Sequence, residues 1–284
     1  MVEVLKVDYM AQAAPEQFAK TLKETGFAVL TNHPVDWNLI EKAYVDWHKF
    51  FNSDYRHNYK FDRVKQEGYV DSKTSEMAKG HAVKDIKEFY QMYYPWGRYP
   101  KEISDASRKL FEQTFALAGE LLGWVEDNMP VELRAKLDRP LREMICVDRT
   151  QQRFLYYPAI QGDEPIGAIR AAAHEDINLI TILPAATQPG LQVKAEGTNN
   201  EWVDVKVEPH SLVVNIGDML QEATDHYYIS TSHRVVKPAE ENAGKPRLSI
   251  PMFLHPAADV KISSRYPRAD LYLDERLHEL GLMG

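Results

Sequence analysis

The stretch His174-Glu175-Asp176 places an imidazole and a carboxylate two positions apart in the chain. On an extended segment, side chains at such positions point to the same face, so His174 and Asp176 can reach a single ion. His233 follows far enough along the chain to return on another strand and add a second imidazole. Two imidazoles and one carboxylate suit ferrous iron and leave its opposite face open. The stretch therefore predicts a metal site, against the alternative that the pattern arose by chance among the chain's 10 histidines.

Short apolar or alternating runs surround these residues in the second half of the chain. They lie at 153–157, 179–183, 191–193, 202–207, 211–216 and 248–254. Val203, Val205 and Val207 alternate with polar residues, as expected of a half-buried strand. The sequence Gly197-Thr198-Asn199-Asn200 between two runs is typical of a hairpin turn. Closely spaced strands with turns between them predict an antiparallel sandwich or barrel.

The first half of the chain is dominated by helical patterns. Helices are predicted at 15–25, 37–51 and 104–128, strands at 5–7 and 27–30, and a closing helix at 270–280. Residues 54–100 keep no sustained period, which favours a lid or binding loop with a short strand or turn at 85–90. We therefore predict a single domain over 1–284 that is mainly β with flanking α. An N-terminal α/β layer at 1–144 would pack on a β-rich core at 145–284.

Composition narrows the class of protein. The 284 residues are 44% hydrophobic and 27% charged, which predicts an ordinary globular chain. A net charge of −8 argues against nucleic-acid and membrane partners, because both need basic surfaces. Cys146 is the single cysteine, so an intrachain disulfide is excluded. The first residues lack the pattern of a signal peptide, so we expect a cytoplasmic protein. We also expect a monomer or a weak homo-oligomer.

Several motifs in order along the chain carry a family resemblance. They are Tyr156-Tyr157-Pro158, His174-x-Asp176, Gly190-Leu191-Gln192-Val193, Asn215-Ile216-Gly217-Asp218, His233-Arg234-Val235 and Arg247-x-Ser249. On these motifs the chain resembles the iron/2-oxoglutarate-dependent oxygenases of the isopenicillin N synthase type, also called iron/ascorbate oxidoreductases. The likeness is firm over about 145–258 and looser in the N-terminal part.

This resemblance implies a fold, a reaction and a set of site residues. The fold would be a double-stranded β-helix, or jelly roll, with helices around it. His174, Asp176 and His233 would be the catalytic metal ligands and bind Fe(II). Arg247 and Ser249, with Tyr157 as a third contact, would bind the distal carboxylate of 2-oxoglutarate, since Arg pairs with carboxylates in a bidentate way. The enzyme would use O2 to hydroxylate a small-molecule C–H bond, releasing succinate and CO2, and ascorbate is kept open as a reductant.

Two alternatives remain open on the sequence. In one, the Arg-x-Ser pair binds the carboxylate of the substrate itself and 2-oxoglutarate is not needed. In the other, the chain is a metal-binding β-barrel that acts as a sensor or binding module without catalysis. Desaturation or ring closure could also replace hydroxylation.

Other polar residues near the motifs are assigned ordinary roles. Glu175 is predicted to point away from the metal into solvent, and His210 to occupy a turn. Asp218 is expected to organise a turn rather than bind metal. For Arg170 we expect surface solvation, with contact to an anionic substrate as the alternative.

Overall fold

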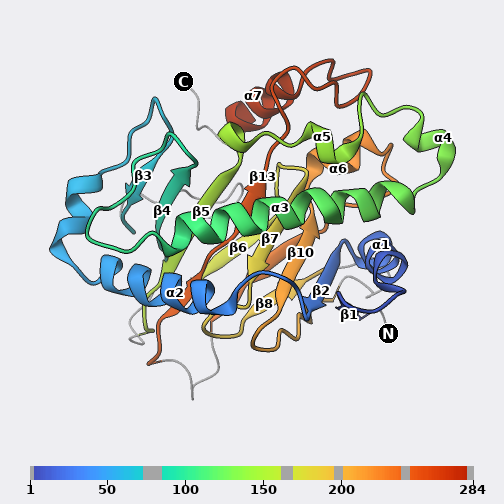
Figure 1. The fold of residues 1–284 in the computed structure, drawn as a ribbon. Coiled ribbons are helices and arrows are strands. Elements are labelled where there is room, and N and C mark those ends of the chain that lie inside the picture. The colour runs from blue at the N-terminus through green and yellow to red at the C-terminus, as the bar shows by residue number, and fades with distance from the viewer. Residues whose placement is uncertain (1–2, 73–84, 161–168, 195–200, 238–243, 280–284) are drawn as a thin grey trace.

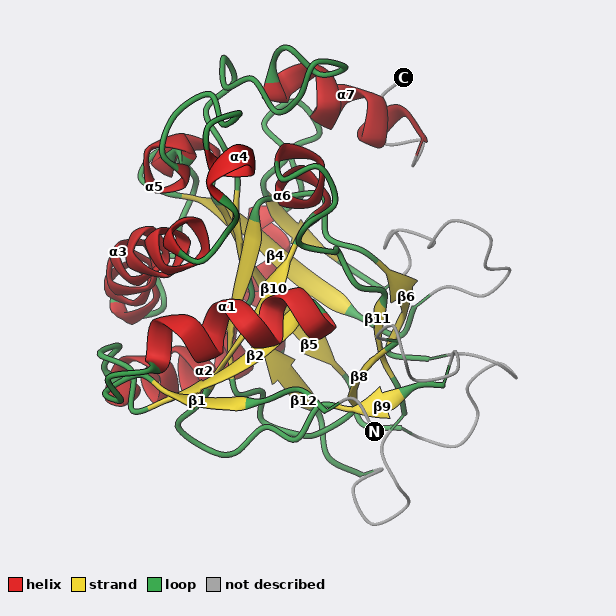
Figure 2. Ribbon diagram, turned by 90° about the vertical axis from the view of Figure 1, so that its right-hand side faces the viewer, coloured by secondary structure: helices red, strands yellow, loops and turns green. Residues whose placement is uncertain are grey.

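The computed structural model describes residues 3–72, 85–160, 169–194, 201–237 and 244–279. Its core is a large sheet with a smaller sheet on one side and helices α1 (Ala14–Thr25), α2 (Trp37–Phe51) and α3 (Ala106–Asp127) on the other (Figure 1, Figure 2). The mainly β fold with flanking helices predicted from the sequence is therefore confirmed.

The large sheet has nine strands in the order β1-β2-β10-β7-β13-β5-β4-β3, with β12 pairing the far end of β5. Its strands are β1 (Lys6–Asp8), β2 (Phe27–Thr31), β3 (Gly68–Val70), β4 (Glu88–Tyr93), β5 (Gln151–Tyr157), β7 (Ile180–Pro184), β10 (Leu212–Ile216), β12 (Arg247–Ser249) and β13 (Met252–Leu254). The β1–β2 pair is parallel, and the other pairs are antiparallel. Predicted runs such as 153–157 and 211–216 thus become strands of one sheet.

The smaller sheet has four strands in the order β6-β11-β8-β9. Its strands are β6 (Ala171–His174), β11 (His233–Val235), β8 (Leu191–Val193) and β9 (Val203–Asp204). β9 is shorter than the predicted run at 202–207. The expected hairpin turn at 197–200 lies outside the described residues. β6 and β11 were missing from the predicted apolar runs because they are short and carry histidines.

The predicted long helices are present as α1 (Ala14–Thr25), α2 (Trp37–Phe51) and α3 (Ala106–Asp127). Gly26 ends α1 in the left-handed conformation (φ 72°), where its amide donates to the carbonyl of Leu22. Trp47 of α2 is buried, stacks on Phe154 at 3.7 Å between ring centroids, and donates to Ser107 Oγ at 2.8 Å. These contacts fix the helical layer on the large sheet.

Shorter helices close the rest of the fold. They are α4 (Val131–Arg134), α5 (Leu141–Met144), α6 (Asp218–Ala223), α7 (Ala269–Glu279) and two 3-10 helices at Asp54–Tyr59 and Val147–Arg149. α7 corresponds to the predicted closing helix. Among the described residues, no helix has the length and apolar character needed to span a membrane.

The prediction for 54–100 was a lid or binding loop with a short strand or turn at 85–90, and a strand is present there as β4, shifted to Glu88–Tyr93, whereas β3 was not predicted. β3 and β4 form there, and β4 pairs with β5 along its whole length. The sequence gives no alternating signal because both faces of β4 are buried, with Phe89, Tyr90, Gln91 and Met92 all inside.

The division into a layer at 1–144 and a core at 145–284 stays a prediction. β2 pairs with β10 and β4 pairs with β5, so strands from the first half complete the sheet of the second. This continuous hydrogen bonding favours a single domain.

Candidate metal centre

Two strands of the smaller sheet bring the predicted metal ligands together. His174 ends β6, His233 begins β11, and the two residues lie directly opposite each other in the pairing of these strands. Their ring centroids are 4.3 Å apart. Asp176 follows β6, and its Oδ1 lies 3.8 Å from Nε2 of each histidine. Among the described residues, these three form a group whose ligand atoms all lie within 4.8 Å of one another.

Asp176 is oriented by hydrogen bonds to one of its two oxygens. Oδ2 accepts from Thr181 Oγ1 at 2.6 Å and from Asn215 Nδ2 at 2.8 Å, which leaves Oδ1 directed at the histidines. Burial opposes ionisation of this 7% exposed residue, but the two histidines and the two hydrogen bonds outweigh it and lower its pKa. The carboxylate is therefore charged and presents one free oxygen.

Both histidines are oriented in the same way through the other ring nitrogen. Nδ1 of His174 lies 2.8 Å from the carbonyl of Ala172, and Nδ1 of His233 lies 3.2 Å from that of Thr231. A neutral ring that donates from Nδ1 turns the lone pair of Nε2 toward the centre. Burial and the neighbouring His233 lower the pKa of His174 to about 4, which favours this neutral form.

One side of the group is open. The His174 side chain is 45% exposed, whereas the side chains of His233 and Asp176 are 10% and 6% exposed. Two nitrogens, one carboxylate oxygen and an open side match the ligand chemistry of a divalent first-row metal. Such an ion holds ligands at about 2.0–2.2 Å, so the donor atoms would close inward slightly around it.

A tight turn beneath the group holds it in place. Asn178 Nδ2 donates to Thr181 Oγ1 at 2.9 Å, and the amide of Asp218 donates to the Asp176 carbonyl at 2.7 Å. Gly217 lies so close to Asn178 that an added Cβ would overlap its carbonyl and side-chain oxygens. Asp218 begins α6, directly after the turn that it was expected to organise.

The residues assigned to an acidic co-substrate share one face of the large sheet. Arg247 pairs with Tyr157 and Ser249 with Leu155, and the same register continues into β13, where Met252 pairs with Gln152. Arg247 and Ser249 therefore face the same way as Phe253, which lies opposite Thr181. Since Thr181 contacts Asp176, this is the face that looks toward the metal group.

Arg247 is buried beside Tyr157. It is 2% exposed, its Cζ lies 5.2 Å from the centroid of the Tyr157 ring, and its Nε donates to the carbonyl of Gln188 at 3.0 Å. Burial lowers its pKa, which Tyr157 partly offsets. Ser249 is also buried. The structure thus brings Arg247 and Tyr157 into contact and puts Ser249 on the same face.

The predicted surface position of Arg170 is wrong. The residue is 0% exposed, just before β6, and its Nη2 donates to the carbonyl of Lys245 at 3.1 Å. The prediction followed the general preference of arginine for solvent, which this position overrides. Glu175 is exposed and His210 lies exposed in a turn, as expected.

Sequence reasoning missed Thr181 and Asn178 as supports of the carboxylate. Thr181 is the polar residue in the apolar run 179–183, and that exception was the available signal. No sequence signal marked Asn178, because its contact with Gly217 depends on how two distant segments fold together.

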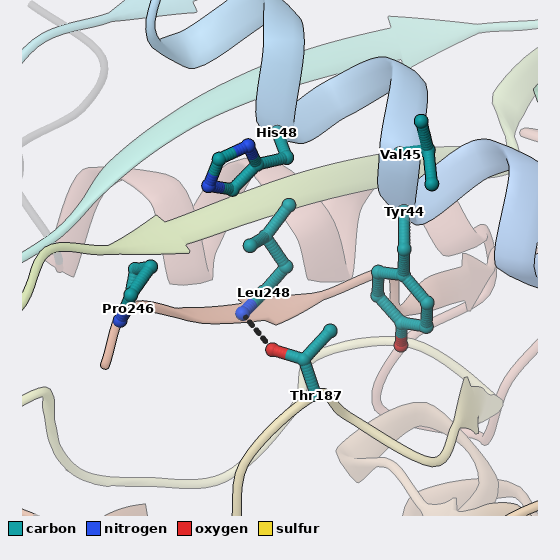
Figure 3. A pocket seen from close by; sticks show the side chains of 6 residues that line it. All are labelled: Tyr44, Val45, His48, Thr187, Pro246 and Leu248. Atoms are coloured by element: carbon teal, nitrogen blue, oxygen red, sulfur yellow. Dashed lines mark hydrogen bonds between the residues drawn. The ribbon is translucent and has the colours of Figure 1, made fainter. Parts of the chain in front are cut away.

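A separate hollow of about 320 Å³ lies between α2 and β12 (Figure 3). Its lining residues are Tyr44, Val45, His48, Thr187, Pro246 and Leu248. Leu248 alternates with Arg247 and Ser249 along β12, so the hollow is on the opposite face of the strand from the metal group. It contains none of the metal-ligating side chains.

Comparison with known proteins gives two family matches. Residues 149–256 match the family model of the 2OG-Fe(II) oxygenase superfamily. Residues 7–113 match the model of the N-terminal region of non-haem dioxygenases in morphine synthesis.

A candidate oxygenase of known structure from Shewanella oneidensis is 47% identical, with a TM-score of 0.88 over 99% of this chain and 100% of that one. The chain is 26% identical to oxoglutarate-dependent flavonoid 7-O-demethylase 1 of Ocimum basilicum, over 92% of this chain and 71% of the relative. It is 28% identical to jasmonate-induced oxygenase 2 of Arabidopsis thaliana, over 84% of this chain and 63% of the relative. The chain thus spans about two thirds of the length of these plant relatives, and the predicted jelly-roll fold is confirmed.

Proposed function

Because the chain belongs to the 2OG-Fe(II) oxygenase superfamily, we propose that it oxidises a C–H bond of a small molecule, with hydroxylation as the expected outcome. The reaction would consume O2 and 2-oxoglutarate and release succinate and CO2. The basil relative is named as a flavonoid 7-O-demethylase, which supports a small organic substrate without specifying it here.

The observation that carries this proposal is the convergence of His174, Asp176 and His233 on one open-sided point. In the proposal these residues hold Fe(II), with Nε2 of each histidine and Oδ1 of Asp176 as donors. When bound there, ferrous iron supplies the redox chemistry that couples O2 to decarboxylation of 2-oxoglutarate and oxidation of the substrate. Thr181 and Asn215 keep Asp176 from rotating, which fixes the geometry of the donors.

In the same proposal, Arg247, Ser249 and Tyr157 hold the distal carboxylate of 2-oxoglutarate. A guanidinium forms a charge-assisted pair with carboxylate, and the two hydroxyls can donate to the same oxygens. Burial of Arg247 strengthens the pairing because water is excluded from it. These contacts position the co-substrate and leave the open side of the metal group for the substrate.

The first experiment is anaerobic addition of Fe(II) and then 2-oxoglutarate to metal-free protein, with a visible spectrum after each addition. The expected result is a weak charge-transfer band that needs both additions and that requires about 100-fold more 2-oxoglutarate in Arg247→Ala. If iron binds but the band does not form, the function assigned to the protein would change to that of an oxidase that needs no 2-oxoglutarate and binds its substrate's carboxylate at Arg247. Failure to bind iron would remove the oxygenase function for this site.

A further inference from the structure

Arg170 is a fully buried cation that the proposed function does not use. It is 0% exposed, and one of its three nitrogens, Nη2, donates to a backbone carbonyl. Its Nε and Nη1 are buried without a hydrogen-bond partner. Across the described parts of the chain, no ion pair joins it to an acidic residue. A buried guanidinium in this state is unfavourable unless something else completes its hydrogen bonding.

Arg247 also has an unsatisfied buried nitrogen, and it begins β12 two residues beyond Lys245, whose carbonyl accepts the hydrogen bond from Arg170 Nη2. It is 2% exposed, and its Nη1 is a third buried nitrogen without a partner. The positive charge of Arg247 acts on Arg170, and Tyr157 interacts with both. Burial is the largest cause that lowers the pKa of Arg170, to about 10, and the charge of Arg247 is the second largest. Two cations thus repel each other inside the protein, and three of their nitrogens have no hydrogen-bond partner.

The position of this pair along the strands limits which anion could join it. Arg170 precedes His174 by four residues on the chain entering β6, about 13 Å if the chain is extended. His174 pairs with His233 at one end of the β6–β11 ladder and Ala171 with Val235 at the other, so Arg170 lies at the end away from the metal group. A ligand that binds the metal with one end and the arginines with the other must therefore carry a metal-binding group and a separate anionic group.

We infer that Arg170 and Arg247 form a two-guanidinium pocket for one carboxylate, and that its occupant is the distal carboxylate of 2-oxoglutarate. Arg170 would donate through Nε and Nη1 to one side of the carboxylate, and Arg247 through Nη1 to the other. The assignment rests on the proposed function and extends it, because Arg170 lies outside the Arg-x-Ser motif. The shared chemistry is a buried carboxylate, which could also come from the substrate.

The experiment combines a change in the protein with a change in the ligand. Wild type, Arg170→Gln and Arg170→Lys are loaded anaerobically with Fe(II) and titrated with 2-oxoglutarate or with 2-oxopentanoate, which lacks the distal carboxylate. The charge-transfer band gives the Kd in each case. Arg63→Gln, at an exposed arginine, is the matched control.

The expected result is a Kd for 2-oxoglutarate raised at least about tenfold in Arg170→Gln, since hydrogen bonds to a charged group are lost. The Kd for 2-oxopentanoate should stay within about twofold, Arg170→Lys should fall between, and Arg63→Gln should match wild type. An equal loss for both ligands would make Arg170 a structural residue and overturn the inference. Unchanged binding of both ligands would overturn it as well. If Arg170→Gln does not fold, Arg170→Lys decides by the same ratio.

A second readout separates this inference from the proposed function. Thermal unfolding of metal-free protein is measured with glutarate and with pentanoate, which differ by one carboxylate. If wild type shows no band with 2-oxoglutarate, the proposed function fails. Stabilisation by glutarate in wild type but not in Arg170→Gln would then keep the pocket and assign it to a substrate carboxylate. Absence of both responses would overturn the pocket too.

Discussion

The proposed site has a metal end, formed by His174, Asp176 and His233, and an arginine end, formed by Arg170 and Arg247. The two ends differ in how many of their polar atoms have hydrogen-bond partners within the protein. At the metal end, Asp176 Oδ2 and Nδ1 of both histidines have protein partners, so the atoms left over are those that face the centre. At the arginine end, three buried nitrogens of Arg170 and Arg247 have none. In the proposed function, the metal end would therefore be ordered before its ligand arrives, whereas the arginine end would be completed by its ligand. Mutations should affect the two ends in different ways.

The largest effect should come from His233→Ala, which removes a donor from the ordered end. Iron-dependent turnover should be lost by more than the roughly 10–100-fold typical of outer partners of a metal site. The fold should persist, because the neighbouring strand pairing is made by backbone atoms. Bound iron per chain, oxygen consumption and circular dichroism measure this. His226→Ala, at an exposed histidine, is the control, and full activity in His233→Ala would remove this residue from the site.

Arg247→Ala should act on the arginine end alone. The 2-oxoglutarate concentration needed for half-maximal turnover should rise by about 100-fold, since a buried charge-assisted pair is lost. The iron requirement should stay near that of wild type. Parallel titrations of iron and co-substrate measure the two effects, and an equal rise in both would contradict the separation of the two ends.

Sequence patterns predicted that His174, Asp176 and His233 come together, and they predicted most of the fold, because these signals are local. The spacing His174-x-Asp176 survives in the structure as neighbouring donors, and the apolar stripe of α2 is buried as expected. The strand or turn predicted at 85–90 did not give the bounds of β4, because burial on both faces removes alternation. The burial of Arg170 was not predicted, because the residues around it come from segments far apart in the chain, including β12. Burial of a charge is a tertiary property that single-residue preferences cannot show.

Gly217→Ala tests how tightly the turn beneath the metal end is packed. The added Cβ would overlap two oxygens of Asn178, so the free energy of unfolding should fall by about 1–3 kcal/mol. Iron affinity should fall with it, because Asn178 supports Thr181. Gly123→Ala is the matched control, since nothing lies near its Cβ on α3, and it should be more stable by about 0.5–1 kcal/mol. Equal melting temperatures for the two variants would show that the turn has room to relax.

Thr181→Val should give the smallest effect and is the finest test of the ordered end. Valine keeps the shape but removes the donor to Asp176 Oδ2, while Asn215 still donates to the same oxygen. Asp176 should then sample other rotations, and iron affinity should fall by about tenfold, measured by competition with a chelator. Thr114→Val is the control, because the Thr114 hydroxyl is buried without a partner and its loss should leave stability equal or higher. If Thr181→Val bound iron as tightly as wild type, Asn215 alone would suffice, and the orientation of the Asp176 carboxylate would rest on one hydrogen bond.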